Sequence, residues 1–317
     1  MKKKNYLMPL IILISILMMT PIIFSNSGYY LSLAMLVLTF IVAANALNIV
    51  VGYGGMLSLG SAGFLIIGGY TLGIVLQYFP TIPFPIVMII AGFFSAITGF
   101  IIGLPAVKLK GHFLAVATLG FGICVPKIIL YFPNITKGYN GLPIPNHVAN
   151  LNLKFYSISI ILILCLVAIY VILNSNLGRV FLAIKDSEVA AASVGVNVSR
   201  YRVLIFTISA FFSGIAGAGN AYWIGFISVD DYTLMTSFFI LAMVVIGGKS
   251  KMLGVTLGAV LLTIIPHFTD VYVGVTNILI GVIVMVVILF LPEGLLSPFK
   301  IREKKTIELK REVTNID

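Results

Sequence analysis

Apolar residues run along most of this chain in long blocks that short polar segments separate. A helix needs about 20 mostly apolar residues to cross a bilayer, with a range of about 17 to 25. Ten blocks approach or reach this length and predict an all-α polytopic membrane protein with spans near residues 7–24, 29–51, 56–76, 84–104, 111–132, 155–173, 203–224, 234–248, 253–268 and 275–291. The eighth and ninth blocks are short, so eight or nine spans are the alternatives to ten.

Composition and charge support this fold class. Of the 317 residues, 60% are hydrophobic and 9% are charged, whereas soluble domains are about 25% charged. Charged residues do not occur from Asn5 to Val107, and the first acidic residue is Asp186. A stretch of this length without charge does not form a water-exposed surface.

The basic residues predict the orientation. With the N-terminus inside, Lys137 and Lys154 fall in outer connections and Lys127 falls within a span. The other 17 of the 20 basic residues fall on the inner side: Lys2, Lys3, Lys4, Lys108, Lys110, Arg179, Lys185, Arg200, Arg202, Lys249, Lys251 and six from Lys300 to Arg311. Basic residues favour the cytoplasmic side, so both termini are predicted to be cytoplasmic. The net charge of +10 then reflects membrane topology, and a nucleic-acid partner is not expected.

The predicted organisation is one transmembrane domain over residues 1–300, which contains a cytoplasmic loop at 174–202, and a basic cytoplasmic tail at 301–317. Three lysines and an apolar run at the start also fit a cleaved signal peptide. That run is close to span length and carries Pro9 and Pro21, which favours retention as a first helix.

Catalytic chemistry is not expected. The histidines His112, His147 and His267 are scattered, and none has a second ligand at metal-binding spacing. The segment 247–250 ends like a phosphate-binding loop, but Met243 stands where that loop needs its first glycine. We therefore predict neither an enzyme nor a cofactor or metal site. Membrane-embedded coupling charges are also lacking, which points to an energy source on another chain.

The loop 174–202 is the longest inner connection before the tail. Residues 181–194 are predicted to form one amphipathic helix, with Gly195 ending it. One stripe of this helix contains Phe181, Ile184, Glu188, Ala191 and Ala192. The stripe fits either a surface helix within a solvated linker or a docking helix for a cytoplasmic partner.

Uncharged polar residues also occur at membrane depth, namely Asn45, Asn48, Ser58, Ser61 and Asn220. A buried amide or hydroxyl is costly unless it is hydrogen-bonded. These residues therefore either hold helices together or line a wet translocation path. The glycines of 52–55 are also compatible with an unwound break that borders a cavity.

Several segments, in order, resemble the branched-chain amino acid permease family of ATP-binding cassette (ABC) importers. Glu188-Val189-Ala190-Ala191 with Gly195 fits the coupling signature E-x-A-A-x-x-x-G, within a longer similar stretch from Gly178 to Gly217. The other matching segments are Leu47-Asn48 with 52–60, Lys110–Phe113 with Thr118–Gly120, and Phe290–Leu295. The resemblance covers roughly residues 30–298. The chain departs from the family pattern at Lys249 and Lys251, and at Lys137.

The resemblance implies a permease subunit that moves branched-chain amino acids, or related small polar solutes, across a bacterial or archaeal cytoplasmic membrane. Its implied partners are cytoplasmic ATP-binding subunits, a second permease, more often a different chain than a copy, and an external substrate-binding protein. The residues implied to couple to the ATPase are Arg179, Lys185, Asp186, Glu188, Ala190, Ala191 and Gly195. The alternatives are a sugar or nucleoside permease of the same superfamily and an ATP-independent facilitator or channel.

Overall fold

The computed structural model describes residues 18–21, 28–109, 111–145, 148, 150–269, 281 and 285, and most of these residues are helical. Eight of the ten predicted spans coincide with helices. Within the described ranges, seven helical segments are long and apolar enough to cross a membrane, and Met252–Pro266 is a shorter apolar helix. The predicted spans 7–24 and 275–291 lie almost wholly outside the described residues, as does the tail 301–317.

The long helices are α2 (Gly28–Asn48), α3 (Ser61–Tyr78), α4 (Phe84–Ala106), α5 (His112–Tyr131), α7 (Leu151–Asn174), α10 (Val198–Ile224), α11 (Leu234–Gly247) and α12 (Met252–Thr269). A π-helical turn, η1 (Ile49–Tyr53), extends α2. The short elements are α6 (Pro133–Thr136), η2 (Gly138–Asn140), β1 (Leu142–Pro143), α8 (Asn176–Asp186), α9 (Glu188–Ser193), β2 (Phe226–Ile227) and η3 (Val229–Asp231).

Two helices begin at other residues than the predicted spans. The predicted span 56–76 begins as a helix only at Ser61, because residues 54–60 are irregular and Gly55 adopts a positive φ of 67°. Lys154, which precedes the predicted span 155–173 and was assigned to the outer side, lies in the first turn of α7 and is 4% exposed. Its ammonium group lies 5.0 Å from the ring centroid of Tyr222, so an aromatic face stabilises the buried cation.

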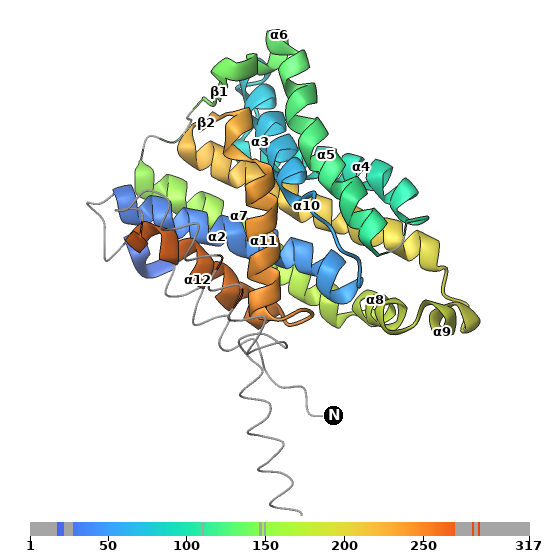
Figure 1. Ribbon diagram of the computed structural model, residues 1–317. Helices are drawn as coiled ribbons and strands as arrows, with labels where there is room; N and C mark the ends of the chain where they lie inside the picture. Colours follow the sequence, from blue (N-terminus) through green and yellow to red (C-terminus); the bar gives the residue numbers. More distant parts are fainter. Residues whose placement is uncertain are drawn as a thin grey trace, which may run out of the picture.

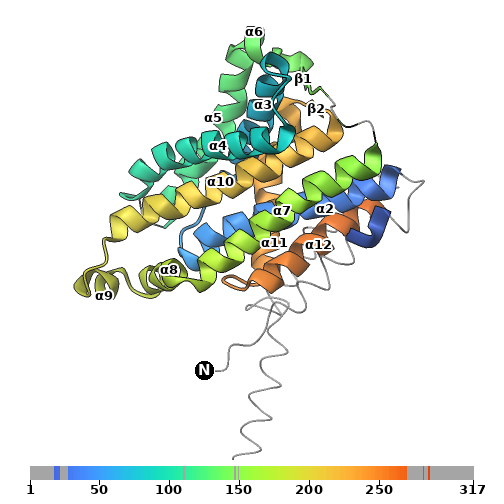
Figure 2. The same cartoon turned by 180° about the vertical axis from the view of Figure 1, so that it is seen from behind.

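Helix α10 occupies the middle of the bundle and packs against α2, α3, α4 and α7. Figure 2 shows it between α4 and the pair formed by α7 and α2. Glycines allow this packing. A Cβ atom on Gly68 would lie 2.0 Å from the carbonyl oxygen of Gly214, and one on Gly217 would lie 2.1 Å from that of Leu65. The backbones of α3 and α10 are therefore in direct contact, as small residues permit between membrane helices.

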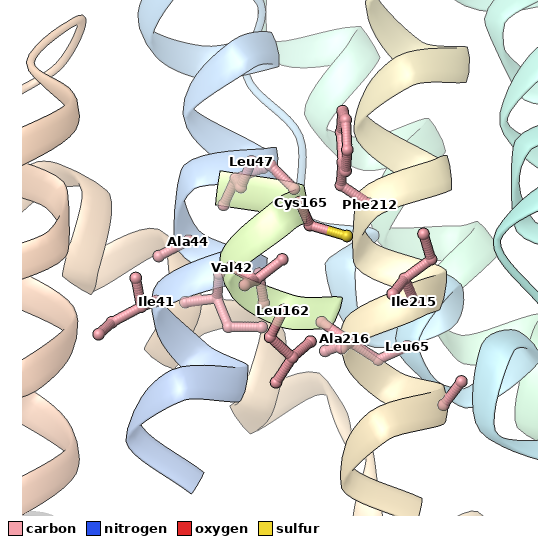
Figure 3. Packing of buried hydrophobic residues seen from close by; sticks show 14 of the residues in the cluster. Ile41, Val42, Ala44, Leu47, Leu65, Leu162, Cys165, Phe212, Ile215 and Ala216 are labelled. Carbon is pink, nitrogen blue, oxygen red and sulfur yellow. The ribbon is translucent and has the colours of Figure 1, made fainter. Parts of the chain in front are cut away.

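The apolar core continues from this contact toward α2 and α7. Figure 3 shows side chains from four helices meeting there: Ile41, Val42, Ala44 and Leu47 of α2, Leu65 of α3, Leu162 and Cys165 of α7, and Phe212, Ile215 and Ala216 of α10. All of them are buried. The large exposed side chains of α4 include Phe93, Ile97 and Phe100, as expected of a helix that faces lipid on one side.

The predicted inner and outer connections gather at opposite ends of the bundle (Figure 1). At one end, β1 pairs antiparallel with β2, with Leu142 opposite Ile227. At the other end, a side-chain nitrogen of Arg202 donates to the carbonyl of Val107 at 3.3 Å, and the ammonium of Lys185 donates to the hydroxyl of Ser250 at 2.7 Å. Three predicted inner connections therefore meet at one end.

The glycine contact between α3 and α10 predicts a strong positional effect. Gly68→Ala places a methyl group against a backbone carbonyl that cannot move without shifting α10. We expect it to lower the free energy of unfolding in detergent by roughly 1–3 kcal/mol, the usual cost of overpacking. Gly120→Ala on α5 is the matched control, because a Cβ there meets nothing within 4 Å. Equal stability of the two variants would contradict the backbone contact.

Candidate functional site

The predicted coupling helix 181–194 is in fact two helices that meet at Ser187. The backbone of Ser187 is extended, with φ of −159°, and the Ser187 hydroxyl accepts a hydrogen bond from the amide of Ala190 at 3.2 Å. Serine is a favoured N-cap residue because its oxygen satisfies a free amide of the first turn. The cap ends α8 and starts α9, so the expectation of one continuous helix was wrong. Gly195 follows α9 with a φ of +86°, in the predicted terminating position.

Only part of the predicted stripe is buried. Phe181, Ile184 and Ala191 are buried, whereas Ala192 is exposed. Phe181 packs edge-on against Tyr201 of α10, with ring centroids 6.4 Å apart. The buried side of α8 and α9 therefore faces the bundle.

An ion pair attaches α9 to α10. Glu188, the first residue of α9, pairs with Arg202, and its side chain is 37% exposed against 9% for Arg202. Arg202 also donates to the carbonyl of Val107, which follows α4. One guanidinium group thus joins three segments. Glu188 is engaged within the chain, although the signature alone implied a contact with the ATPase.

We call α8, α9 and the Ser187 cap between them the elbow. Most exposed residues of α9 and of the turn after it are small and apolar. Val189 and Val194 are 81% and 77% exposed, and Ala190 and Gly195 are exposed beside them. We call these four residues the α9 face. The two valines were not among the predicted coupling residues. Val189 and Val194 lie on either side of the buried Ala191 in the sequence. Their exposure can be inferred only once α9 is known to begin at Glu188.

The charged residues predicted for coupling are spread over α8. Asp186 is exposed, and Arg179 is hydrogen-bonded to Asn176 one turn earlier on the same helix. Lys185 points in a different direction, to Ser250 in the connection between α11 and α12. Lys185 therefore does not lie with the residues of the α9 face.

The two asparagines of α2 make hydrogen bonds to other elements. The side chain of Asn45 donates to the hydroxyl of Thr256 on α12 at 3.0 Å. The side-chain oxygen of Asn48 accepts from the backbone amide of Ser250 at 3.1 Å. Both asparagines are fully buried. A Cβ atom on Gly52 would lie 1.9 Å from the side-chain oxygen of Asn48, so this turn of η1 leaves room for Asn48.

The other predicted pathway residues lie at two places. Ser58 and Ser61 are at the end of the irregular segment 54–60 and the start of α3, and both are buried. Asn220 lies near the other end of α10, where it donates to the hydroxyl of Tyr232 at 3.1 Å. Ser58 and Ser61 thus lie together where the irregular segment meets α3, whereas Asn220 is hydrogen-bonded to the connection that follows α10.

Backbone amides around the irregular segment are satisfied by side chains of other helices. The amide of Leu59 donates to Thr118 of α5 at 2.9 Å, and the amide of Ala62 donates to Ser237 of α11 at 3.0 Å. Irregular backbone at membrane depth requires such partners. Over the residues that the structure describes, no three His, Cys, Asp or Glu side chains are grouped to hold a metal ion.

These features define a polytopic membrane protein with an exposed helical elbow at one end of its bundle. The profile of the family described as "Branched-chain amino acid transport system / permease component" matches residues 29–292. The chain belongs to this family, which confirms the predicted resemblance, and family and apolar helices together assign it to the cytoplasmic membrane as a multi-pass transport protein.

Three relatives illustrate the similarity. The high-affinity branched-chain amino acid transport system permease protein LivM of Salmonella typhimurium is 31% identical over 325 residues, which cover 93% of this chain and 75% of the relative. LivM of Escherichia coli is 32% identical over 294 residues, 83% and 69% of the two chains. The ribose import permease RbsC of Haemophilus influenzae is 28% identical over 148 residues, 41% and 39% of the two chains. No solved structure matches significantly.

The ion pair gives a testable energetic difference. Glu188→Gln leaves the guanidinium of Arg202 mostly buried and without its counter-charge. Because water screens the half-exposed Glu188, we expect a loss of about 1–2 kcal/mol in the free energy of unfolding. Asp186→Asn removes an exposed carboxylate two positions away, so it should change stability by less than about 0.5 kcal/mol. Denaturant titration in detergent measures both, and equal losses would contradict a stabilising role for the pair.

Proposed function

We propose that this chain is a membrane-spanning permease subunit of an ABC importer for branched-chain amino acids. The α9 face carries the proposal: an exposed apolar surface on the signature segment, fixed to the bundle by the Glu188–Arg202 pair. Exposed apolar side chains at the aqueous end of a membrane protein favour a protein partner. The ion pair would transmit movement of the docked partner to α10 as a rigid displacement.

The proposed partners follow from the family. Two cytoplasmic ATP-binding subunits would supply the energy, one docked on the α9 face of each permease. ATP hydrolysis is therefore assigned to those chains. A second permease, more often a different chain than a copy, would complete the path. An external binding protein would deliver substrate at the end that carries β1 and β2. With both termini cytoplasmic and ten spans in all, the α9 face lies in the cytoplasm.

The substrate class rests on the extent of the similarity. The relatives named for branched-chain amino acids match most of this chain, whereas the ribose importer matches less than half of it. This difference favours branched-chain amino acids over sugars. An ATP-independent facilitator would have no need of the α9 face, so the importer also accounts better for the exposed valines.

For the translocation path, we propose the region where the irregular segment 54–60 meets α3. Ser58 and Ser61 supply hydroxyl groups there, and the segment is held by hydrogen bonds to two separate helices, α5 and α11. Asn45, Asn48 and Asn220 are hydrogen-bonded between elements in this conformation. They would border the path only in a conformation in which those bonds open.

If the ATP-binding subunits dock on the α9 face, removing its apolar side chains should weaken their binding. Changing both Val189 and Val194 to Ser removes buried apolar area from the complex. We expect about 2–3 kcal/mol weaker binding of the ATP-binding subunits, or roughly 30- to 150-fold in affinity. Arg200→Ser is an exposed control on the first turn of α10. Co-purification in mild detergent and ATP-dependent uptake measure the effect. Normal assembly and uptake by the double variant would remove the proposed docking surface.

The path proposal predicts thiol reactivity that depends on turnover. In a chain with Cys124 and Cys165 replaced by Ser and Ala, Ser58→Cys and Ser61→Cys should react with a water-soluble thiol reagent during transport. Asn220→Cys, near the C-terminal end of α10, is tested separately, because it would react only in a conformation that exposes that end of the helix. We expect the reaction rate at residues 58 and 61 to rise several-fold on adding ATP and substrate. Unchanged rates at both positions would place the path elsewhere.

A further inference from the structure

The connection between α11 and α12 contacts two distant segments through one side chain. The hydroxyl of Ser250 donates to the carbonyl oxygen of Gly52 at 2.6 Å and accepts from the ammonium of Lys185 at 2.7 Å. Its backbone amide donates to the side-chain oxygen of Asn48 at 3.1 Å. We call Lys185, Ser250, Asn48 and Gly52 the Ser250 junction. A hydroxyl has one donor and two acceptor sites, so both contacts of the Ser250 side chain form together.

The local backbone is adapted to this junction. Ser250 has a positive φ of 62°, one of two such non-glycine residues among those the structure describes. Residues other than glycine rarely adopt this conformation, and such strain persists where surrounding contacts maintain it. Gly52 has no side chain to obstruct the approach, because a Cβ atom there would lie 2.6 Å from the amide nitrogen of Ser250.

The junction joins the elbow to the break in α2. Lys185 is in the last turn of α8, next to the Ser187 cap that starts α9. Gly52 is in η1, the π-helical turn that precedes the irregular segment 54–60. The side chain of Lys185 also covers Gly55, where a Cβ atom would lie 3.0 Å from its Cγ. A displacement of α8 therefore acts directly on the backbone at 52–55.

We propose that Ser250 is a positioning residue that transmits the movement of α8 to the π-helical turn of α2 and so to the irregular segment beside α3. The proposal rests on the proposed importer function and adds a second link to it. The Glu188–Arg202 pair moves α10, whereas the Ser250 junction moves the end of α2. A π-helical turn is a local departure from α-helical bonding that is frequent at functional sites, and in this proposal it is the element that changes arrangement during transport.

The test measures coupling in the assembled importer. The complex is purified from native membranes, reconstituted in liposomes with its binding protein, and assayed for leucine taken up per ATP hydrolysed. Ser250→Ala removes both hydroxyl contacts, and Lys185→Met removes the ammonium while keeping the stem over Gly55. Lys249→Met is the matched control, because Lys249 is an exposed lysine on the same connection.

We expect leucine per ATP to fall about 5-fold or more in Ser250→Ala and in Lys185→Met, within the usual range of coupling between two sites, and to stay normal in Lys249→Met. The double variant should be no worse than Ser250→Ala, because Lys185 acts through the Ser250 hydroxyl. A merely structural role would lower the amount of complex and leave this ratio unchanged.

Each alternative result is decisive. Normal ratios in both single variants overturn the role of the junction while the importer stands. If Ser250→Ala does not assemble, Lys185→Met carries the same test at an exposed residue. If the unaltered chain neither binds ATP-binding subunits nor takes up leucine with ATP, the proposed function itself fails, and that outcome is distinct from a failure of the junction.

Discussion

The contact on which the bundle depends is the approach of α3 to α10 through Gly68, Gly214 and Gly217. Lipid tails are as apolar as leucine side chains, so burial from water does not drive membrane helices together, and close packing has to do so. Direct backbone contact gives that packing. It fixes α10 in the middle of the bundle, with α4 on one side and α2 and α7 on another. The ends of these helices then determine where the short elements and connections lie.

The rigid centre contrasts with the break in the chain between α2 and α3. Residues 49–60 pass through a π-helical turn and an irregular segment in which side chains of α5 and α11 satisfy backbone amides. These hydrogen bonds stabilise the present arrangement, because a buried amide that loses its partner at membrane depth costs several kcal/mol. A break held by separate helices is stable in each arrangement in which its amides find partners. This property would suit the role proposed for the segment, at the border of the path.

The sequence alone predicted the elements whose signal is local and repeated. Apolar length located eight helices, and basic residues grouped the connections that the structure joins through Arg202 and Ser250. The start of α3 was misplaced because hydropathy does not register the left-handed backbone at Gly55, which interrupts the apolar run. The elbow at Ser187 was missed because the serine cap lies inside a continuous amphipathic pattern, and that pattern alone does not show the interruption of the helix. Long-range pairs such as Lys185 with Ser250 leave no trace in one sequence, since 65 positions separate them.

In the proposed importer, the positions of the two links would explain why the signature segment carries both a charged and an apolar side. Glu188 and Lys185 face the bundle and end in hydrogen bonds to α10 and to Ser250, while Val189 and Val194 remain on the surface. Apolar contacts are non-directional and tolerate a partner that shifts as it moves. Charge-assisted hydrogen bonds are short and directional, so in this proposal they would pass a displacement to defined backbone positions. A docking element that carried its charges outward and its valines inward would hold the partner yet lose its hold on α2 and α10.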